Sequence, residues 1–65
     1  MIIVNGESTG LDKPITVYQW LENRGLNPEL VAVEHNGELL TREQFRTAVV
    51  KDGDVLEVVR FVGGG

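Results

Sequence analysis

The sequence contains no cysteine, a single histidine (His35) and no apolar stretch close to the roughly 20 residues that a membrane span needs. The absence of cysteine excludes disulfides, a cysteine-ligated zinc site and a thiol nucleophile. Basic residues are also few, at 6 against 10 acidic ones, and the net charge of −4 argues against nucleic-acid binding, which needs clustered Lys and Arg. No basic segment followed by an apolar run opens the chain, so no secretory signal is predicted. We therefore expect a soluble, cytoplasmic protein that binds neither nucleic acid nor a membrane.

The length of 65 residues predicts one small domain. A chain of this size buries only about 60% of the surface that its unfolded form exposes. With no disulfide or cysteine-ligated metal to help, we expect stability to come from core packing and from strong local folding signals.

Two Asn-Gly dipeptides, at residues 5–6 and 36–37, are typical of tight β-hairpin turns. Each follows an apolar run, "MIIV" or "LVAV", that reads as a strand. The predicted strands cover residues 1–5, a weaker edge strand at 7–11, and 30–35 with a short return through Leu39.

The segment "ITVYQWLENRGLNP" carries the clearest helix signature. Thr16 and Gln19 have the spacing of a capping box, in which each side chain satisfies a backbone amide of the other residue. Gly25 is a natural terminator, and Pro28 prevents continuation of the helix. The apolar residues that share one face are Val17, Trp20 and Leu21.

The same capping pattern returns at Thr41 and Gln44, where β-branched residues soon follow and predict only a short second helix. A polar turn at 51–54 then leads into a final strand, "VLEVVRFV". The predicted fold class is α+β, with a mixed sheet of four to five strands packed on one main helix.

The final strand has two distinguishable faces, because successive side chains alternate across a sheet. We assign the set that contains Glu57 to the outside, since a buried unpaired carboxylate is costly. Val59 and Phe61 then become exposed apolar residues. They are either a partner surface or a strand covered by a neighbouring loop.

Side-chain chemistry is sparse. His35 lies at a strand end, and we predict it to be a solvated surface residue. No serine or threonine has an identifiable base, "DGD" lacks the spacing of a calcium loop, and no phosphate-binding glycine motif occurs. We therefore expect no autonomous enzyme, no metal site and no bound cofactor.

The three glycines at 63–65 end the sequence. They extend about 10 Å at most, enough to thread a carbonyl carbon into another protein's site. Without a Cβ they pass narrow channels and adopt conformations closed to other residues. The other interpretation is a frayed or engineered end, and the glycines taken alone favour neither.

The order of these features resembles the ThiS family, the sulfur carrier proteins of thiamine (thiazole) biosynthesis. The resemblance covers essentially the whole chain and is carried by "NGE" near residue 36, "REQF" at 42–45, "DGD" at 52–54 and the ending "FVGGG". Three terminal glycines, where the family has two, are a minor departure.

The resemblance implies a ubiquitin-like β-grasp fold over residues 1–62 and a flexible glycine tail at 63–65. It also implies that Gly65 is adenylated by an ATP-dependent, ubiquitin-activating-like adenylyltransferase. Sulfur from cysteine, usually delivered by a desulfurase, would then convert the adenylate to a thiocarboxylate that thiazole synthase consumes. Gly63, Gly64, Phe61 and Val59 would serve partner docking and channel threading. ATP would be used by the activating partner.

Two alternatives remain open at this point. A related carrier, such as the small subunit of molybdopterin synthase, would use the same terminal chemistry. A β-grasp binding module with an inert tail would have no sulfur chemistry.

Overall fold

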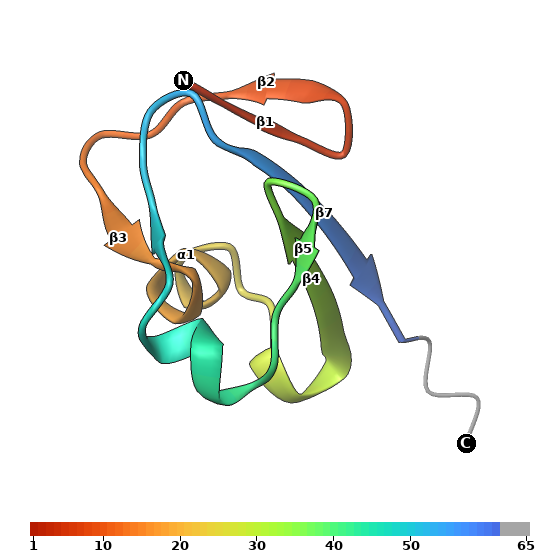
Figure 1. Cartoon of the computed structure of the whole chain (residues 1–65). Helices are drawn as coiled ribbons and strands as arrows, with labels where there is room; N and C mark the ends of the chain where they lie inside the picture. Colours follow the sequence, from red (N-terminus) through yellow and green to blue (C-terminus); the bar gives the residue numbers. More distant parts are fainter. Residues whose placement is uncertain (62–65) are drawn as a thin grey trace.

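The computed structural model describes residues 1–61, and within them a five-stranded mixed sheet carries helix α1 against one face (Figure 1). The predicted α+β class, with a mixed sheet on one main helix, is therefore confirmed. The elements in chain order are β1 (Ile2–Val4), β2 (Glu7–Thr9), β3 (Ile15–Thr16), α1 (Val17–Asn23), η1 (Pro28–Leu30), β4 (Val31–His35), β5 (Glu38–Leu39), η2 (Glu43–Arg46), β6 (Val49–Val50) and β7 (Val55–Arg60).

The last strand, β7, lies at the centre of the sheet, whose spatial order is β2-β1-β7-β4-β5. β7 runs parallel to β1 and antiparallel to β4, and both outer pairs are antiparallel hairpins. The first and the last strand of the described chain, β1 and β7, therefore lie side by side in the middle of the sheet.

Both predicted hairpin turns are formed. Asn5 and Gly6 have φ of 49° and 83°, and Asn36 and Gly37 have φ of 51° and 86°. Two successive positive φ values define a type I′ turn, whose twist matches that of the flanking strands. Asparagine and glycine are the residues that adopt this conformation at least cost.

The capping box of α1 is present as predicted. The backbone amide of Gln19 donates to Thr16 Oγ1 at 3.1 Å, and the backbone amide of Thr16 donates to Gln19 Oε1 at 3.2 Å. At the other end, the Leu26 amide bonds the Leu21 carbonyl at 2.9 Å while Gly25 has φ of 72°. This is a Schellman termination, which explains why the helix stops at Asn23.

The second capping box also forms, yet the expected short second helix is a single 3₁₀ turn, η2. The backbone amide of Gln44 donates to Thr41 Oγ1 at 3.2 Å, and the backbone amide of Thr41 donates to Gln44 Oε1 at 2.8 Å. The helix cannot lengthen because the chain must reach β6, which pairs with β3 in a separate two-stranded sheet. The Val17 amide donates to the Ala48 carbonyl at 2.9 Å and fixes this approach.

The core lies between the inner face of the sheet and the layer that contains α1 and η2. The apolar side chains that are buried among the described residues are Ile2, Val17, Trp20, Leu21, Val31, Val33, Leu40, Phe45, Val50 and Leu56. They include the predicted helix face and the inward residues of the central strands. In the described range, no helix is long and apolar enough to cross a membrane.

Candidate functional site

We begin the description of the candidate site with the hydrogen bonds of β7, because this strand leads to the predicted arm at residues 63–65. The side chain of Asn5 extends the ladder beyond β1. Its Oδ1 accepts from the Val58 amide at 2.7 Å, and its Nδ2 donates to the Val58 carbonyl at 3.1 Å. On the other side of β7, Asn36 Oδ1 accepts from the Val55 amide at 2.9 Å. The two turn asparagines thus complete the hydrogen bonding of β7, which fixes its course.

The outer face of the sheet presents an apolar surface near the end of β7. Val59 faces Ala32 across the ladder, and the Phe61 amide donates to the Leu30 carbonyl at 2.8 Å. Val59 is 59% exposed and Phe61 is 52% exposed. We call these four residues, Leu30, Ala32, Val59 and Phe61, the apolar end of the sheet.

The assignment of faces within β7 agrees with the sequence argument. Leu56 is buried and Val58 is partly buried, whereas Val55, Glu57 and Val59 are exposed. The exposure of Val59 and Phe61 is thus established, while their role in docking stays a prediction. The predicted arm, residues 63–65, and the predicted domain boundary after residue 62 lie outside the described residues.

The structure corrects the interpretation of His35. Instead of being solvated, its side chain is only 17% exposed, and Nε2 lies 2.8 Å from Oδ2 of Asp54. Strand β4 turns His35 toward the inner side of the sheet, where the 51–54 turn places Asp54 beside it. Sequence reasoning missed this pair because the two residues are 19 positions apart and meet only through the pairing of β4 with β7.

Asp54 is the buried polar residue at the hub of this cluster. Burial alone would raise the pKa of its carboxyl group. Hydrogen bonds from His35, the Lys51 backbone amide and Asn36 lower the pKa and outweigh the effect of burial. The Lys51 ammonium, 3.5 Å away, lowers it further. Their combined effect lowers the pKa of Asp54 from 3.8 to about 2. The cluster anchors the start of β7 to the turn that follows β4, which is a structural role.

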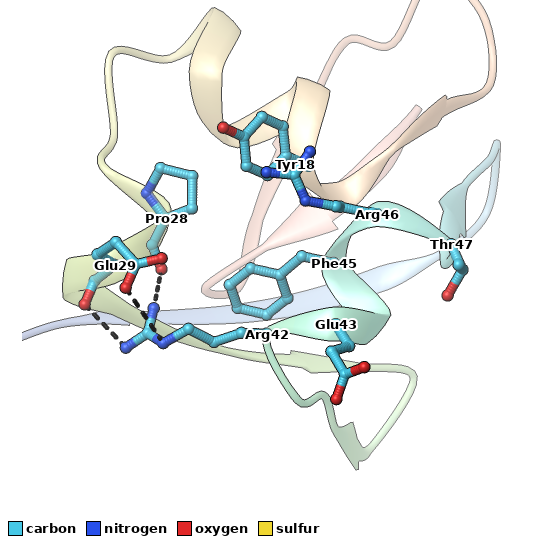
Figure 2. Close-up of a pocket in the computed structure, with 8 residues that line it drawn as sticks. All are labelled: Tyr18, Pro28, Glu29, Arg42, Glu43, Phe45, Arg46 and Thr47. Atoms are coloured by element: carbon cyan, nitrogen blue, oxygen red, sulfur yellow. Dashed lines mark hydrogen bonds and ion pairs between the residues drawn. The ribbon is translucent and has the colours of Figure 1, made fainter.

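A groove of about 450 Å³ opens between α1, η1 and η2 (Figure 2). The Arg46 guanidinium lies 4.2 Å from the centre of the Tyr18 ring, and Phe45 forms part of the lining. Arg42 donates to the carbonyl oxygens of Pro28 and Glu29, the latter at 2.8 Å. Because Arg42 is engaged with the backbone of η1, it holds η2 against η1 and contributes to the packing of this layer.

Metal ligation finds no support in the described part of the chain. No group of three His, Asp or Glu side chains within residues 1–61 is arranged to hold a metal ion.

The fold and this surface together define the class of the protein. An N-terminal hairpin, a helix across one face of the sheet and a last strand parallel to the first are the features of the ubiquitin-like β-grasp. In this chain, the exposed apolar end of the sheet includes Phe61, the last residue that the structure describes.

Comparison with known proteins narrows the class to a family. The model of the ThiS family matches residues 2–65. The crystal structure of the thiamine biosynthesis protein (ThiS) from Geobacter metallireducens superimposes with a TM-score of 0.84 and 40% identity, covering 98% of this chain and 97% of that one. The sulfur carrier protein ThiS of Bacillus subtilis is 35% identical over 66 residues, covering the whole of both chains. The chain therefore belongs to the ThiS family, the sulfur carriers of thiamine biosynthesis.

A further relative has a different length. The thiazole synthase of Paramagnetospirillum magneticum is 38% identical over 64 residues, which are 98% of this chain but only 20% of that protein. The thiazole synthase of Magnetococcus marinus shows the same identity and coverage. The chain thus spans about a fifth of these two curated relatives.

Proposed function

We propose that the protein carries sulfur as a thiocarboxylate on Gly65 and delivers it for formation of the thiazole ring of thiamine. The observation that carries the proposal is the family match, which continues through the glycines to residue 65. The exposed apolar end of the sheet directly before this segment supports the proposal, because an enzyme that acts on Gly65 needs a surface of the carrier to which it binds.

The chemistry follows from the low reactivity of a carboxylate toward nucleophiles. A ubiquitin-activating-like adenylyltransferase joins the Gly65 carboxylate to the α-phosphorus of ATP and releases pyrophosphate. The terminal sulfur of a cysteine-derived persulfide then attacks the acyl carbon, and AMP leaves. A thiol reductant cleaves the resulting acyl disulfide to give the thiocarboxylate. The carrier supplies the acyl group and the docking surface, and the partners supply ATP binding and catalysis.

Thiazole synthase is the proposed recipient of the sulfur. In the two relatives named thiazole synthase, a segment similar to this chain makes up 20% of the protein. Covalent linkage raises the effective concentration of one module near the other. It is therefore most useful when the two modules act on each other, which supports thiazole synthase as the recipient.

The mass of the intact protein tests the proposal. The chain is incubated with ATP, the adenylyltransferase, a cysteine desulfurase, cysteine and a thiol reductant. We expect the protein to gain the mass of one sulfur less that of one oxygen, with the change located at Gly65. An unchanged mass with partners that modify another ThiS protein would refute the carrier function.

Two further samples sharpen this test. A variant that lacks all three glycines, Gly63 to Gly65, should keep the circular dichroism spectrum and melting temperature of the parent but gain no mass. The loaded protein should then support thiazole formation by thiazole synthase. If it were consumed only by molybdopterin synthase, the chemistry would stand and the pathway would be wrong.

A further inference from the structure

Two carboxylates face each other on the outer side of the sheet. Glu34 in β4 lies directly opposite Glu57 in the β4–β7 ladder, and both side chains are exposed. Directly opposed residues of a sheet have Cβ atoms roughly 5 Å apart, so these two negative charges are close neighbours. Within residues 1–61, neither carboxylate takes part in an ion pair.

This arrangement is unfavourable for the isolated domain. Like charges directly opposite each other destabilise a strand pair, and β4–β7 is the longest pairing of the described sheet. Arg60 is the basic residue closest along β7, but strand alternation directs it away from the face that carries Glu57. Among residues 1–61 the pair therefore has no compensating positive charge, and a positive group from outside the domain would stabilise it.

Apolar side chains lie on both sides of the carboxylates. Along the ladder, the apolar end of the sheet follows on one side, starting with Ala32 and Val59. On the other side, Leu39 lies opposite Glu34 in β5 and is 66% exposed, and Val55 precedes Glu57 by two positions. A partner that covers this face would remove the carboxylates from water, where an opposite charge interacts more strongly with them.

We propose that the partner that adenylates Gly65 places an arginine between Glu34 and Glu57, with apolar side chains around it. This inference rests on the proposed function. A planar guanidinium donates two parallel hydrogen bonds to a carboxylate and has further donors for a second one, so it fits the paired carboxylates better than an ammonium does.

The charge of the reaction favours the adenylating partner over the sulfur acceptor as the occupant. That partner must hold the polyphosphate of ATP where Gly65 arrives, so its surface around the entry point is positive. Glu57 precedes Gly65 by eight residues, at most about 29 Å of extended chain, which exceeds the Debye length of about 8 Å at physiological salt but not that of about 30 Å at 0.01 M. The positive field therefore steers the carboxylates to this enzyme at low salt, and at physiological salt the charges attract each other once the docked surfaces exclude the water between them.

The test uses Glu34→Gln, Glu57→Gln and the double variant in the complete chain. Unfolding in urea should show that the double variant is as stable as the parent or more stable, because the repulsion is removed. The rate of AMP formation by the adenylyltransferase is then measured as a function of carrier concentration. For the double variant, KM for the carrier should rise roughly tenfold while kcat stays unchanged. Raising the salt concentration should increase KM for the parent much more than for the double variant.

Glu22→Gln is the control matched to each single variant, Glu34→Gln or Glu57→Gln, because it also removes one negative charge, from the exposed side of α1. It should leave KM within about twofold of the parent, since surface charges outside an interface contribute little. An equal effect of Glu22→Gln would overturn the proposal in favour of steering by net charge alone. An unchanged KM and salt dependence in the double variant would overturn it outright. A loss of affinity for thiazole synthase, but not for the adenylyltransferase, would show that the occupant is wrong.

Failure of this inference differs from failure of the proposed function. If the parent chain gains sulfur while the double variant keeps the parent's KM, the carrier function stands and the arginine contact falls. If the parent chain gains no sulfur, the proposed function falls first.

Discussion

Replacing Asp54 by Asn tests whether the buried carboxylate stabilises the domain through its charge. Asn keeps the size of the side chain and retains hydrogen-bonding capacity, but it removes the negative charge that faces His35 and Lys51. Lowering of the Asp54 pKa from 3.8 to about 2 corresponds to about 2 kcal/mol of folding free energy at neutral pH. Because Asp54 is only 4% exposed, solvent screening reduces this value little.

The sign of the pH dependence follows from the lowered pKa. The folded carboxyl group has a lower pKa than the unfolded one, so the folded state favours the ionised form. The contribution is fully present above about pH 5, shrinks between pH 4 and pH 2, and is lost once the pH falls below about 2. Asp54→Asn should therefore be about 2 kcal/mol less stable at pH 7, and the difference should vanish near pH 2.

Urea unfolding followed by circular dichroism from pH 2 to pH 8 measures this difference. At pH 7 the melting temperature should fall by roughly 10 °C or more, since small domains lose about 4–8 °C per kcal/mol. Asp52→Asn is the control in the same turn. Its carboxylate pairs with the N-terminal amine but is 85% exposed, so its loss should stay below about 1 kcal/mol. A stability difference between parent and Asp54→Asn that does not change with pH would contradict the electrostatic explanation.

The remaining predictions concern the helix and the apolar end of the sheet. Thr16→Ala should lower the free energy of unfolding by about 1 kcal/mol, and the further change Gln19→Ala should cost less in that background than alone, because the two side chains act as one box. Gly25→Ala should cost about 1 kcal/mol through its φ of 72° alone, since a Cβ there meets nothing within 4 Å; a neutral result in urea unfolding would contradict the helix ending described above. Phe61→Asp should weaken binding to the adenylyltransferase in titration calorimetry at unchanged stability, whereas Leu21→Ala should lower stability by about 2–5 kcal/mol. A large loss of stability in Phe61→Asp would mean that Phe61 belongs to the core.

The features that could be predicted from the sequence are those encoded within a few residues. The hairpin turns need only Asn-Gly and its flanking strands, and the capping boxes need only residues three positions apart. Exposure of Val59 and Phe61 followed from one charged neighbour, Glu57, and the alternation of a strand. In each case the local signal agrees with the demands of the whole fold.

The features that escaped prediction depend on residues far apart in the sequence. Strands β3 and β6 have two residues each and exist because α1 and η2 bring them together. Neither segment has the length or alternation that identifies a strand. The contact of His35 with Asp54 and the facing carboxylates of Glu34 and Glu57 depend on the β4–β7 register, which no local pattern defines. A sequence argument can therefore identify the exposed strand end but not the charges arranged beside it.

The central place of β7 has a consequence for how the protein is made. The β1–β2 and β4–β5 hairpins are joined into one sheet only through β7, the last strand of the described chain. During synthesis from the N-terminus, these hairpins wait without a shared sheet until residues 55–60 have left the ribosome. A chain interrupted before that point lacks both the folded surface and the segment that follows β7. We therefore expect a partner that recognises the folded face to bind only chains in which the last described strand, β7, has been made.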